Sequence, residues 1–208
     1  MPVRGRFITF EGGEGTGKST QVRRLTDRLA QTGRTVLLTR EPGGSPGAED
    51  IRKLLVEGEP ERWTALSETL LFLAARADHV ARVIEPALAS GKWVICDRFS
   101  DSTVVYQGAG RGLGMERVRA LQRQVGTIAP DLTLVLDLEP HEGLMRAATR
   151  AKGENRYEQF DTGFHRRLRE SFLEIARQEA HRCVIIDVSR PVESIASDIW
   201  QIVTARLG

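Results

Sequence analysis

One glycine-rich stretch near the N-terminus constrains the fold of this 208-residue chain more than any other feature. Residues 12–19 read Gly-Gly-Glu-Gly-Thr-Gly-Lys-Ser and match the P-loop pattern G-x-x-x-x-G-K-[ST]. Residues 6–11 are β-prone, and residues 18–32 repeat apolar side chains at helical spacing. A P-loop needs this strand–loop–helix context, because its glycines let backbone N–H groups converge on a phosphate at a helix N-terminus. The residues expected to bind nucleotide phosphates are Gly12, Gly13, Glu14, Gly15, Thr16, Gly17, Lys18, Ser19 and Thr20.

Two residues of this loop predict specific chemistry. The Lys18 ammonium would reach the β- and γ-phosphates, and the Ser19 hydroxyl would ligate Mg²⁺. Asp97 ends the apolar run 93–97, where a Walker-B-type carboxylate that holds the Mg²⁺ shell is expected. Asp137 competes for that role, and an aspartate at this place would also suit a plain strand end or a helix N-cap.

Five short apolar runs alternate with helical patterns along the chain. The runs are continuous rather than alternating, which is typical of parallel strands covered on both faces. They span residues 6–11, 34–39, 93–97, 132–137 and 182–187. The helical patterns span residues 18–32, 47–57, 65–90, 114–128, 140–151, 161–180 and 191–206. We therefore expect a single domain over residues 1–208, with an α/β fold built on a five-stranded parallel sheet. Ligands of such sheets bind beyond the carboxyl ends of the strands, which places the Pro/Gly-rich loop 40–47 at the site.

The charge balance does not call for a strongly charged partner. Thirty basic against 28 acidic residues leave a net charge of +2, so neither nucleic acid nor an acidic membrane is implied. Cys96 and Cys183 lie in apolar runs, and we expect buried free thiols rather than a disulfide or a metal site. The sequence has no signal-peptide pattern and no apolar run of membrane length, so the expected location is the cytoplasm.

Several short motifs occur in register with those of one enzyme family. Residues 97–108 read Asp-Arg-Phe-Ser-Asp-Ser-Thr-Val-Val-Tyr-Gln-Gly, residues 39–44 read Thr-Arg-Glu-Pro-Gly-Gly, and a helical pattern holds Leu71-Phe72-x-x-x-Arg76. Together with the P-loop, these motifs resemble thymidylate kinases from about residue 6 to the last helix. The resemblance implies a P-loop nucleoside monophosphate kinase fold with a mobile lid. It also implies transfer of the γ-phosphoryl group of ATP to dTMP with Mg²⁺, and a homodimer.

The resemblance assigns the acceptor nucleotide to side chains around the P-loop. Glu14 would accept a hydrogen bond from the sugar 3′-OH, and Tyr106 would pack under the deoxyribose and exclude a 2′-OH. Arg40 and Arg98 would hold the 5′-phosphate. The residues expected near the base are Phe72, stacked on the ring, Arg76 and Thr103, hydrogen-bonded to it, and Gln107, in a supporting position.

A lid is expected over about residues 141–157, and its basic side chains are Arg146, Arg150, Lys152 and Arg156. The P-loop carries Gly15 where one arrangement of the family has a basic residue, so this chain resembles the bacterial arrangement, in which lid arginines supply the charge. An arginine that enters on closure would stabilise the transferring phosphoryl group in its transition state. Arg150 and Arg156 are the expected catalytic pair, although spacing in a mobile loop does not identify the acting residue.

Two other functions compete with this interpretation. A kinase for a different nucleoside monophosphate would use Thr103 and Tyr106 for another base. A P-loop switch protein would bind partners instead of turning over a metabolite, but the chain lacks an Asn-Lys-x-Asp motif and an Asp-x-x-Gly motif after a strand. Without the family resemblance, the helical spacing of Phe72 would indicate ordinary core packing.

Overall fold

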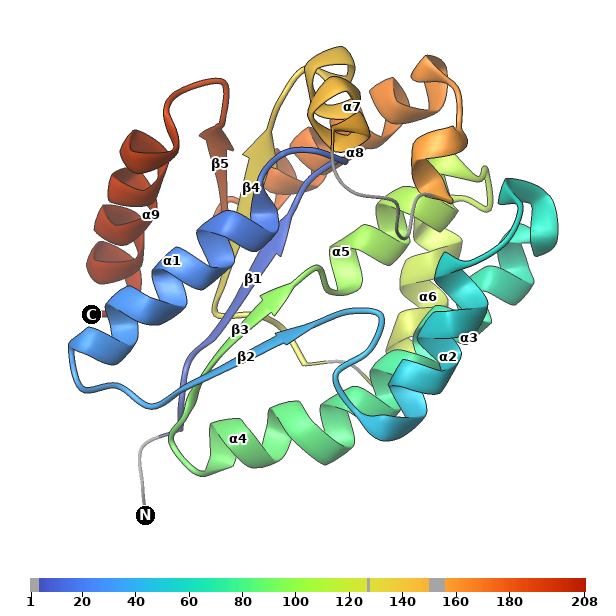
Figure 1. Cartoon of the computed structure of the whole chain (residues 1–208). Coiled ribbons are helices and arrows are strands. Elements are labelled where there is room, and N and C mark those ends of the chain that lie inside the picture. The colour runs from blue at the N-terminus through green and yellow to red at the C-terminus, as the bar shows by residue number, and fades with distance from the viewer. Residues whose placement is uncertain (1–3, 127, 150–155) are drawn as a thin grey trace.

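A computed structural model describes residues 4–126, 128–149 and 156–208 of the chain. Five strands form one parallel sheet in the order β2-β3-β1-β4-β5 (Figure 1). The strands are β1 (Phe7–Glu11), β2 (Val36–Arg40), β3 (Trp93–Asp97), β4 (Leu132–Asp137) and β5 (Cys183–Asp187). Each begins and ends within two residues of its predicted range, so the five-stranded parallel sheet is confirmed.

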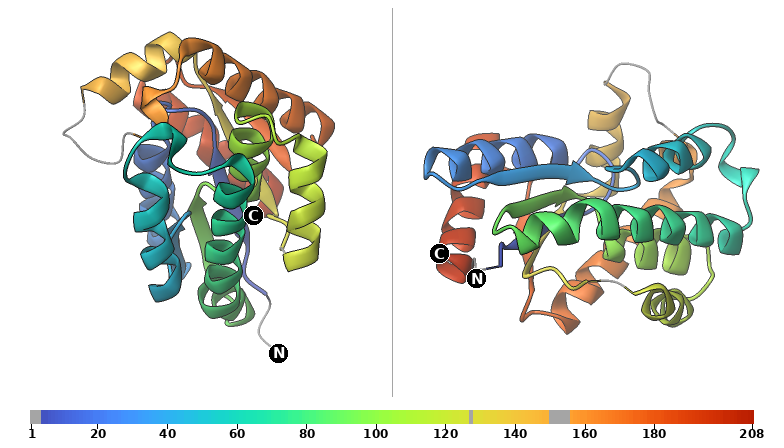
Figure 2. Two further views of the ribbon diagram at one scale, coloured as in Figure 1. Left: turned by 90° about the vertical axis from the view of Figure 1, so that its right-hand side faces the viewer. Right: turned by 90° about the horizontal axis from the view of Figure 1, so that it is seen from below.

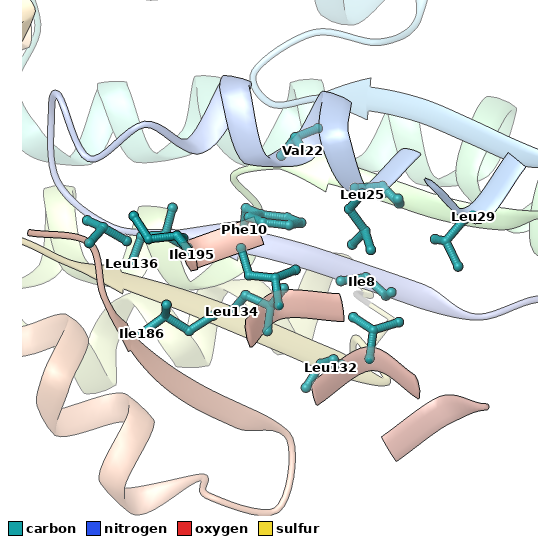
Figure 3. Packing of buried hydrophobic residues seen from close by; sticks show 14 of the residues in the cluster. Ile8, Phe10, Val22, Leu25, Leu29, Leu132, Leu134, Leu136, Ile186 and Ile195 are labelled. Carbon is teal, nitrogen blue, oxygen red and sulfur yellow. The ribbon is translucent and has the colours of Figure 1, made fainter. Parts of the chain in front are cut away.

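Helices cover both faces of the sheet, as its continuous apolar strands predict. On one face, α1 (Lys18–Gln31) packs over β1, β2 and β3, and α9 (Val192–Leu207) packs over β4 and β5. Figure 3 shows Val22, Leu25 and Leu29 of α1 directed toward Ile8 and Phe10 of β1. On the other face, Phe7 and Val94 pack against Ile84 and Leu88, which lie after α3 (Ala65–His79). The opposite half of that face is covered by α8 (Thr162–Gln178).

The predicted helix over residues 65–90 forms in three sections. After α3 the chain makes a π-helical stretch, Val80–Ile84, and continues as α4 (Glu85–Ala89). Pro86 lies two residues after this stretch and cannot donate an i→i−4 hydrogen bond, which is a recognised cause of such a local change. A second π-helical stretch, Val104–Gly110, follows the short α5 (Ser100–Thr103). π-Helical turns often lie at functional sites.

The remaining helices lie beyond the carboxyl ends of the strands. Figures 1 and 2 show α2 and α3 past the ends of β2 and β3, and α7 past the end of β4. Their bounds are α2 (Pro46–Val56), α6 (Met115–Val125) and α7 (Pro140–Ala148), with 3₁₀ turns at Pro60–Arg62 and Tyr157–Gln159. The predicted lid residues Arg150 and Lys152 lie outside the described residues. Within the described part of the chain, every helix is too short or too polar to cross a bilayer.

Candidate active site

The P-loop joins β1 to α1 with the backbone that the glycine pattern predicts. Gly12, Gly15 and Gly17 have φ angles of 136°, 67° and 82°, values that residues with a side chain rarely adopt. Lys18 begins α1, and its Nζ donates hydrogen bonds to the carbonyls of Gly12 at 3.1 Å and Gly13 at 2.6 Å. Burial and the neighbouring Arg98 guanidinium lower the pKa of Lys18 to about 8. The ammonium therefore lies directly over the loop expected to hold phosphates.

The two predicted magnesium ligands lie side by side. The Ser19 hydroxyl donates to the Asp97 carboxylate at 2.8 Å, because β3 pairs with β1 and brings Asp97 opposite Phe10. Asp137, the competing candidate, instead forms an ion pair with Arg169 at 2.6 Å. One hydroxyl and one carboxylate suit Mg²⁺, which keeps several waters and takes further oxygens from phosphates. The arrangement favours Asp97 over Asp137 as the metal-shell carboxylate.

Glu14 is the centre of a partly buried polar cluster at the P-loop. Its carboxylate accepts hydrogen bonds from Arg98 at 2.9 Å and from the Tyr106 hydroxyl at 2.7 Å. Burial alone would raise its pKa, but Arg98 and Lys18 outweigh burial and lower the pKa to about 2. Glu14 is therefore a carboxylate throughout the physiological pH range, held as an acceptor at the end of the P-loop.

Arg98 is strained into this position. Its φ is 67°, and among the described residues no other non-glycine residue has a positive φ. Its guanidinium also donates to the Gly12 carbonyl at 2.9 Å and packs over the Tyr106 ring, 4.9 Å from the ring centre. Backbone strain of this kind persists where the surrounding structure enforces it, and it is concentrated at functional sites.

Two cavities meet at this cluster. The first, called the side cavity, encloses about 680 Å³ and is lined by Phe72, Arg76, Thr103, Tyr106 and Gln107 among others. The second, called the P-loop cavity, encloses about 1200 Å³ and is lined by residues 14–20 with Arg40, Asp97 and Arg146. The residues that line both are Glu14, Glu41, Arg52 and Arg98. Two ligands bound in these cavities would therefore meet beside the Glu14–Arg98 ion pair.

Polar side chains line the deep part of the side cavity, and hydrogen bonds hold them in place. Arg76 is 2% exposed, and its guanidinium donates to Glu41 at 2.7 Å and to Thr103 Oγ1 at 2.8 Å. Its remaining nitrogen, Nη1, is buried and has no hydrogen-bond partner among the described residues. The same is true of Oε1 of Gln107. One donor and one acceptor are thus left for a ligand, and Phe72 lies one helical turn before Arg76.

The predicted phosphate-binding arginines differ in position. Arg98 lines both cavities, whereas Arg40 lines the P-loop cavity alone, is half-exposed and forms an ion pair with Glu49 at 3.0 Å. The structure adds Arg52 of α2, which lines both cavities and donates to the Pro42 carbonyl. Nothing in the sequence distinguishes Arg52 from other helical surface arginines.

Glu11 is a second residue that sequence analysis did not assign. This buried carboxyl group ends β1 and accepts hydrogen bonds from the Phe99 N–H at 2.8 Å and the Ser102 hydroxyl at 2.5 Å. Burial and the nearby Asp101 raise its pKa to about 7. Glu11 thereby fixes the start of α5 against the P-loop strand. Glu11 lies directly before the P-loop motif, but no local pattern indicates its contacts with α5.

Arg156 lies differently from the lid position expected of it. Its side chain is 1% exposed and pairs with the buried Glu68 at 2.5 Å, in the wall of the side cavity. A guanidinium held in this way does not line the P-loop cavity. Among the described basic residues of the predicted lid, Arg146 does, and it donates to the Val188 carbonyl at 3.2 Å.

Comparisons with known proteins agree with this geometry. Residues 10–199 match the family model described as thymidylate kinase. The thymidylate kinase of Dinoroseobacter shibae is 55% identical over 96% of both chains, and that of Ruegeria pomeroyi is 52% identical over 100% of this chain and 98% of the relative. The crystal structure of thymidylate kinase from Ehrlichia chaffeensis superimposes with a TM-score of 0.79 at 33% identity, covering 96% of this chain and 99% of that one. The chain belongs to the thymidylate kinase family.

Proposed function

We propose that this protein phosphorylates dTMP, transferring the γ-phosphoryl group of ATP to give dTDP and ADP. The observation that carries the proposal is the pair of unpartnered polar atoms in the side cavity. Arg76 Nη1 is a donor and Gln107 Oε1 is an acceptor, and both are buried. The edge of thymine offers the complementary pair, a carbonyl oxygen at C4 and an N–H at N3. Leaving such groups unpaired is costly, so a ligand that pairs both is strongly preferred.

The sugar would lie against Glu14 and Tyr106. The Glu14 carboxylate accepts two hydrogen bonds and has lone pairs left for a 3′-OH. The Tyr106 ring is 5% exposed and is fixed by its hydroxyl and by edge-on contacts with Tyr157 and Phe164. A ring held so rigidly leaves little room for an added 2′-OH, which favours deoxyribonucleotides. Thr103 and Phe72 would complete the base site.

The 5′-phosphate of dTMP would then lie at the junction of the cavities, near Arg98, with Arg52 beside it and Arg40 on the P-loop side. An oxygen of this phosphate attacks the γ-phosphorus, and the bond from the γ-phosphorus to the bridging oxygen breaks to release ADP. The attacking oxygen is already anionic, so no side chain has to act as a strong base. The protein contributes positioning and positive charge, the terms that dominate phosphoryl transfer.

The donor phosphates would occupy the loop from Gly12 to Thr20. Lys18 would exchange its carbonyl contacts for phosphate oxygens, and Ser19 and Asp97 would hold Mg²⁺. When bound, Mg²⁺ neutralises charge on the β- and γ-phosphates. Arg150 stays our candidate for a catalytic lid arginine, and Arg146 joins it because it lines the P-loop cavity.

A homodimer is part of the proposal. Leu66, Leu70 and Ala74 are exposed on α3 at intervals of four residues, and the two leucines are 37% and 49% exposed. Such an apolar stripe suits a helix of a second copy. Sedimentation of the wild type should give twice the chain mass, and Leu70→Glu should shift it toward the monomer.

The test of the function is a coupled ADP-release assay with dTMP, dUMP, dCMP, UMP and CMP as acceptors. We expect the highest kcat/KM with dTMP. The value with dUMP should be lower, because dUMP lacks the methyl group of thymine and is otherwise the same. Preference for a cytosine nucleotide, or for a ribonucleotide, would show that the chain serves a different monophosphate. ADP release that none of the acceptors increases would refute the kinase assignment.

A further inference from the structure

A buried carboxylate, Glu68 of α3, organises the far wall of the side cavity. It is 0% exposed and accepts hydrogen bonds from Arg156 at 2.5 Å, Gln107 Nε2 at 2.7 Å and the Tyr157 hydroxyl at 2.9 Å. Arg111 adds a charge contact at 3.7 Å. We refer to these five residues as the Glu68 cluster. Three of them, Gln107, Arg156 and Tyr157, line the side cavity.

The cluster fixes several distant segments to one another. Arg156 also donates to the carbonyls of Leu55 at 3.1 Å and Glu59 at 3.0 Å. The end of α2, the turn after it, α3, the π-helical stretch and the segment before α8 therefore converge on one carboxylate. Breaking a buried ion pair by removing one partner leaves an uncompensated charge. The Glu68–Arg156 ion pair therefore holds these segments in fixed positions relative to one another.

This arrangement settles the orientation of the Gln107 amide. An amide offers a donor nitrogen and an acceptor oxygen of nearly the same shape, and its neighbours decide which way it faces. A carboxylate only accepts, so the group that Gln107 turns toward Glu68 must be Nε2. The Tyr157 hydroxyl donates its proton to Glu68, so its oxygen is left as an acceptor. This oxygen accepts a hydrogen bond from Gln107 Nε2 at 3.3 Å. The amide oxygen Oε1 of Gln107 therefore has no hydrogen-bond partner among the described residues, and Gln107 lines the side cavity.

We propose that Glu68 determines base specificity by holding Gln107 with its amide oxygen available to the substrate. This inference rests on the proposed function. An acceptor at that place pairs with the N3–H of thymine or uracil. Cytosine has an unprotonated N3, itself an acceptor, so the two lone pairs would oppose each other. Glu68 is thus a positioning residue that acts on the base through Gln107 without touching it.

The orientation of the Gln107 amide depends on a carboxylate at position 68, because a carboxylate can only accept hydrogen bonds. A glutamine at the same position offers either an oxygen or an NH₂ group, so the Gln107 amide could turn over and present its nitrogen. That nitrogen would donate to cytosine N3. Arg76 would still face the exocyclic amine of cytosine with a donor, so dTMP would stay the better substrate and the preference would shrink rather than reverse.

The experiment compares kcat/KM for dTMP and dCMP in Glu68→Gln and in the double variant Glu68→Gln/Arg156→Gln. The double variant also removes the arginine whose charge Glu68 neutralises in the wild type. Arg111→Met is the matched control, because it removes a charge contact of Glu68 and leaves the bond to Gln107 in place. Thermal unfolding and circular dichroism report whether each variant is folded.

We expect the dTMP/dCMP ratio to fall by about 10-fold or more in both Glu68 variants, in keeping with the discrimination that one buried hydrogen bond provides. The ratio should stay near the wild-type value in Arg111→Met, even if its overall activity drops. A folded Glu68 variant with the wild-type ratio would overturn the proposal. So would an equal change of the ratio in Arg111→Met.

Equilibrium titration of dTMP and dCMP separates this inference from the proposed function. If the wild type binds dTMP in preference to dCMP without phosphorylating it, the kinase assignment fails, and the same variants still test the role of Glu68 from the two dissociation constants. If the wild type shows no preference between the bases, Glu68 sets no specificity and the inference is wrong.

Discussion

Helix α7, which begins the predicted lid, rests directly on the P-loop through a contact between glycines, and Gly143→Ala tests what that contact does. A Cβ at Gly143 would lie 2.4 Å from the backbone oxygen of Glu14, and a Cβ at Gly15 would lie 1.8 Å from the Gly143 oxygen. Both obstacles are backbone atoms, so no side-chain rotation relieves them. The contact also excludes a basic residue at position 15, whose φ of 67° is unfavourable for a side chain.

Two opposing effects determine how much Gly143→Ala changes the stability of the protein. Alanine favours a helix interior over glycine by about 1 kcal/mol, which would stabilise α7. Ordinary contact begins near 3.4 Å, so α7 and Glu14 must separate by about 1 Å. Overpacking of this kind costs about 1–3 kcal/mol, so the net loss of stability is on the order of 1 kcal/mol. That corresponds to a Tm lower by about 2–4 °C. The effect on turnover is larger, because displacing a catalytic loop by about 1 Å can cost about 100-fold in rate.

Steady-state kinetics with dTMP and ATP, together with thermal unfolding, measure both effects. Met145→Ala is the control, because Met145 lies on the same helix and is 59% exposed. We expect Met145→Ala to keep the wild-type kcat, whereas Gly143→Ala should lose most of it with a small drop in Tm. A Gly143→Ala protein with unchanged kcat and a raised Tm would mean that helix propensity alone governs the site and that α7 does not position the P-loop.

The remaining predictions concern the P-loop and the sugar site. Lys18→Ala should lower kcat by about 100-fold or more with the fold intact by circular dichroism, since its charge lies over the loop and supports no other element. The pKa of Lys18 is depressed to about 8, so its charge is lost as the pH rises through that value. The pH profile of kcat/KM for ATP, which reports the free enzyme, should accordingly fall above about pH 8; a flat profile to pH 10 would contradict the shift. Tyr106→Ala should raise kcat/KM for ribo-TMP relative to dTMP, and an unchanged ratio would remove this ring from the sugar site.

The sheet and the P-loop are the features that sequence predicts best, for a physical reason. A strand buried on both faces is largely apolar, so β1, β3 and β4 stand out as mostly apolar runs. The buried threonines of β1 and β4, Thr9 and Thr133, satisfy each other by a hydrogen bond between their hydroxyls. The P-loop follows from fixed backbone angles at glycines and from the strand and helix on either side. Predicted helix ends lie within three residues of the observed ones, except where a π-helical stretch before Pro86 divides a continuous pattern. The helical segment over residues 100–110 was not among the predicted helical patterns.

Site residues that depend on distant partners are harder to predict. Spacing alone assigns Phe72 to the core, and the motif resemblance was needed to expect it at a ligand. Arg52 and Glu11 matter because of where α2 and α5 dock against the P-loop strand, and no local pattern carries that information. The burial of Glu68 has the same origin, since its partners Gln107 and Arg156 are 39 and 88 positions away along the chain.

Arg156 shows how such a partner changes the interpretation of a basic segment. A cation that acts on closure must move at low cost, yet removing one member of a buried ion pair typically costs about 3–5 kcal/mol. Arg156 is bound to Glu68 and two backbone carbonyls, so it is an anchor rather than a moving group. At the other end, Gly143 anchors α7 on the P-loop. Of the two arginines expected to act, Arg150 lies outside the described residues and stays a prediction. Among the described basic residues of the predicted lid, Arg146 is the one that lines the P-loop cavity.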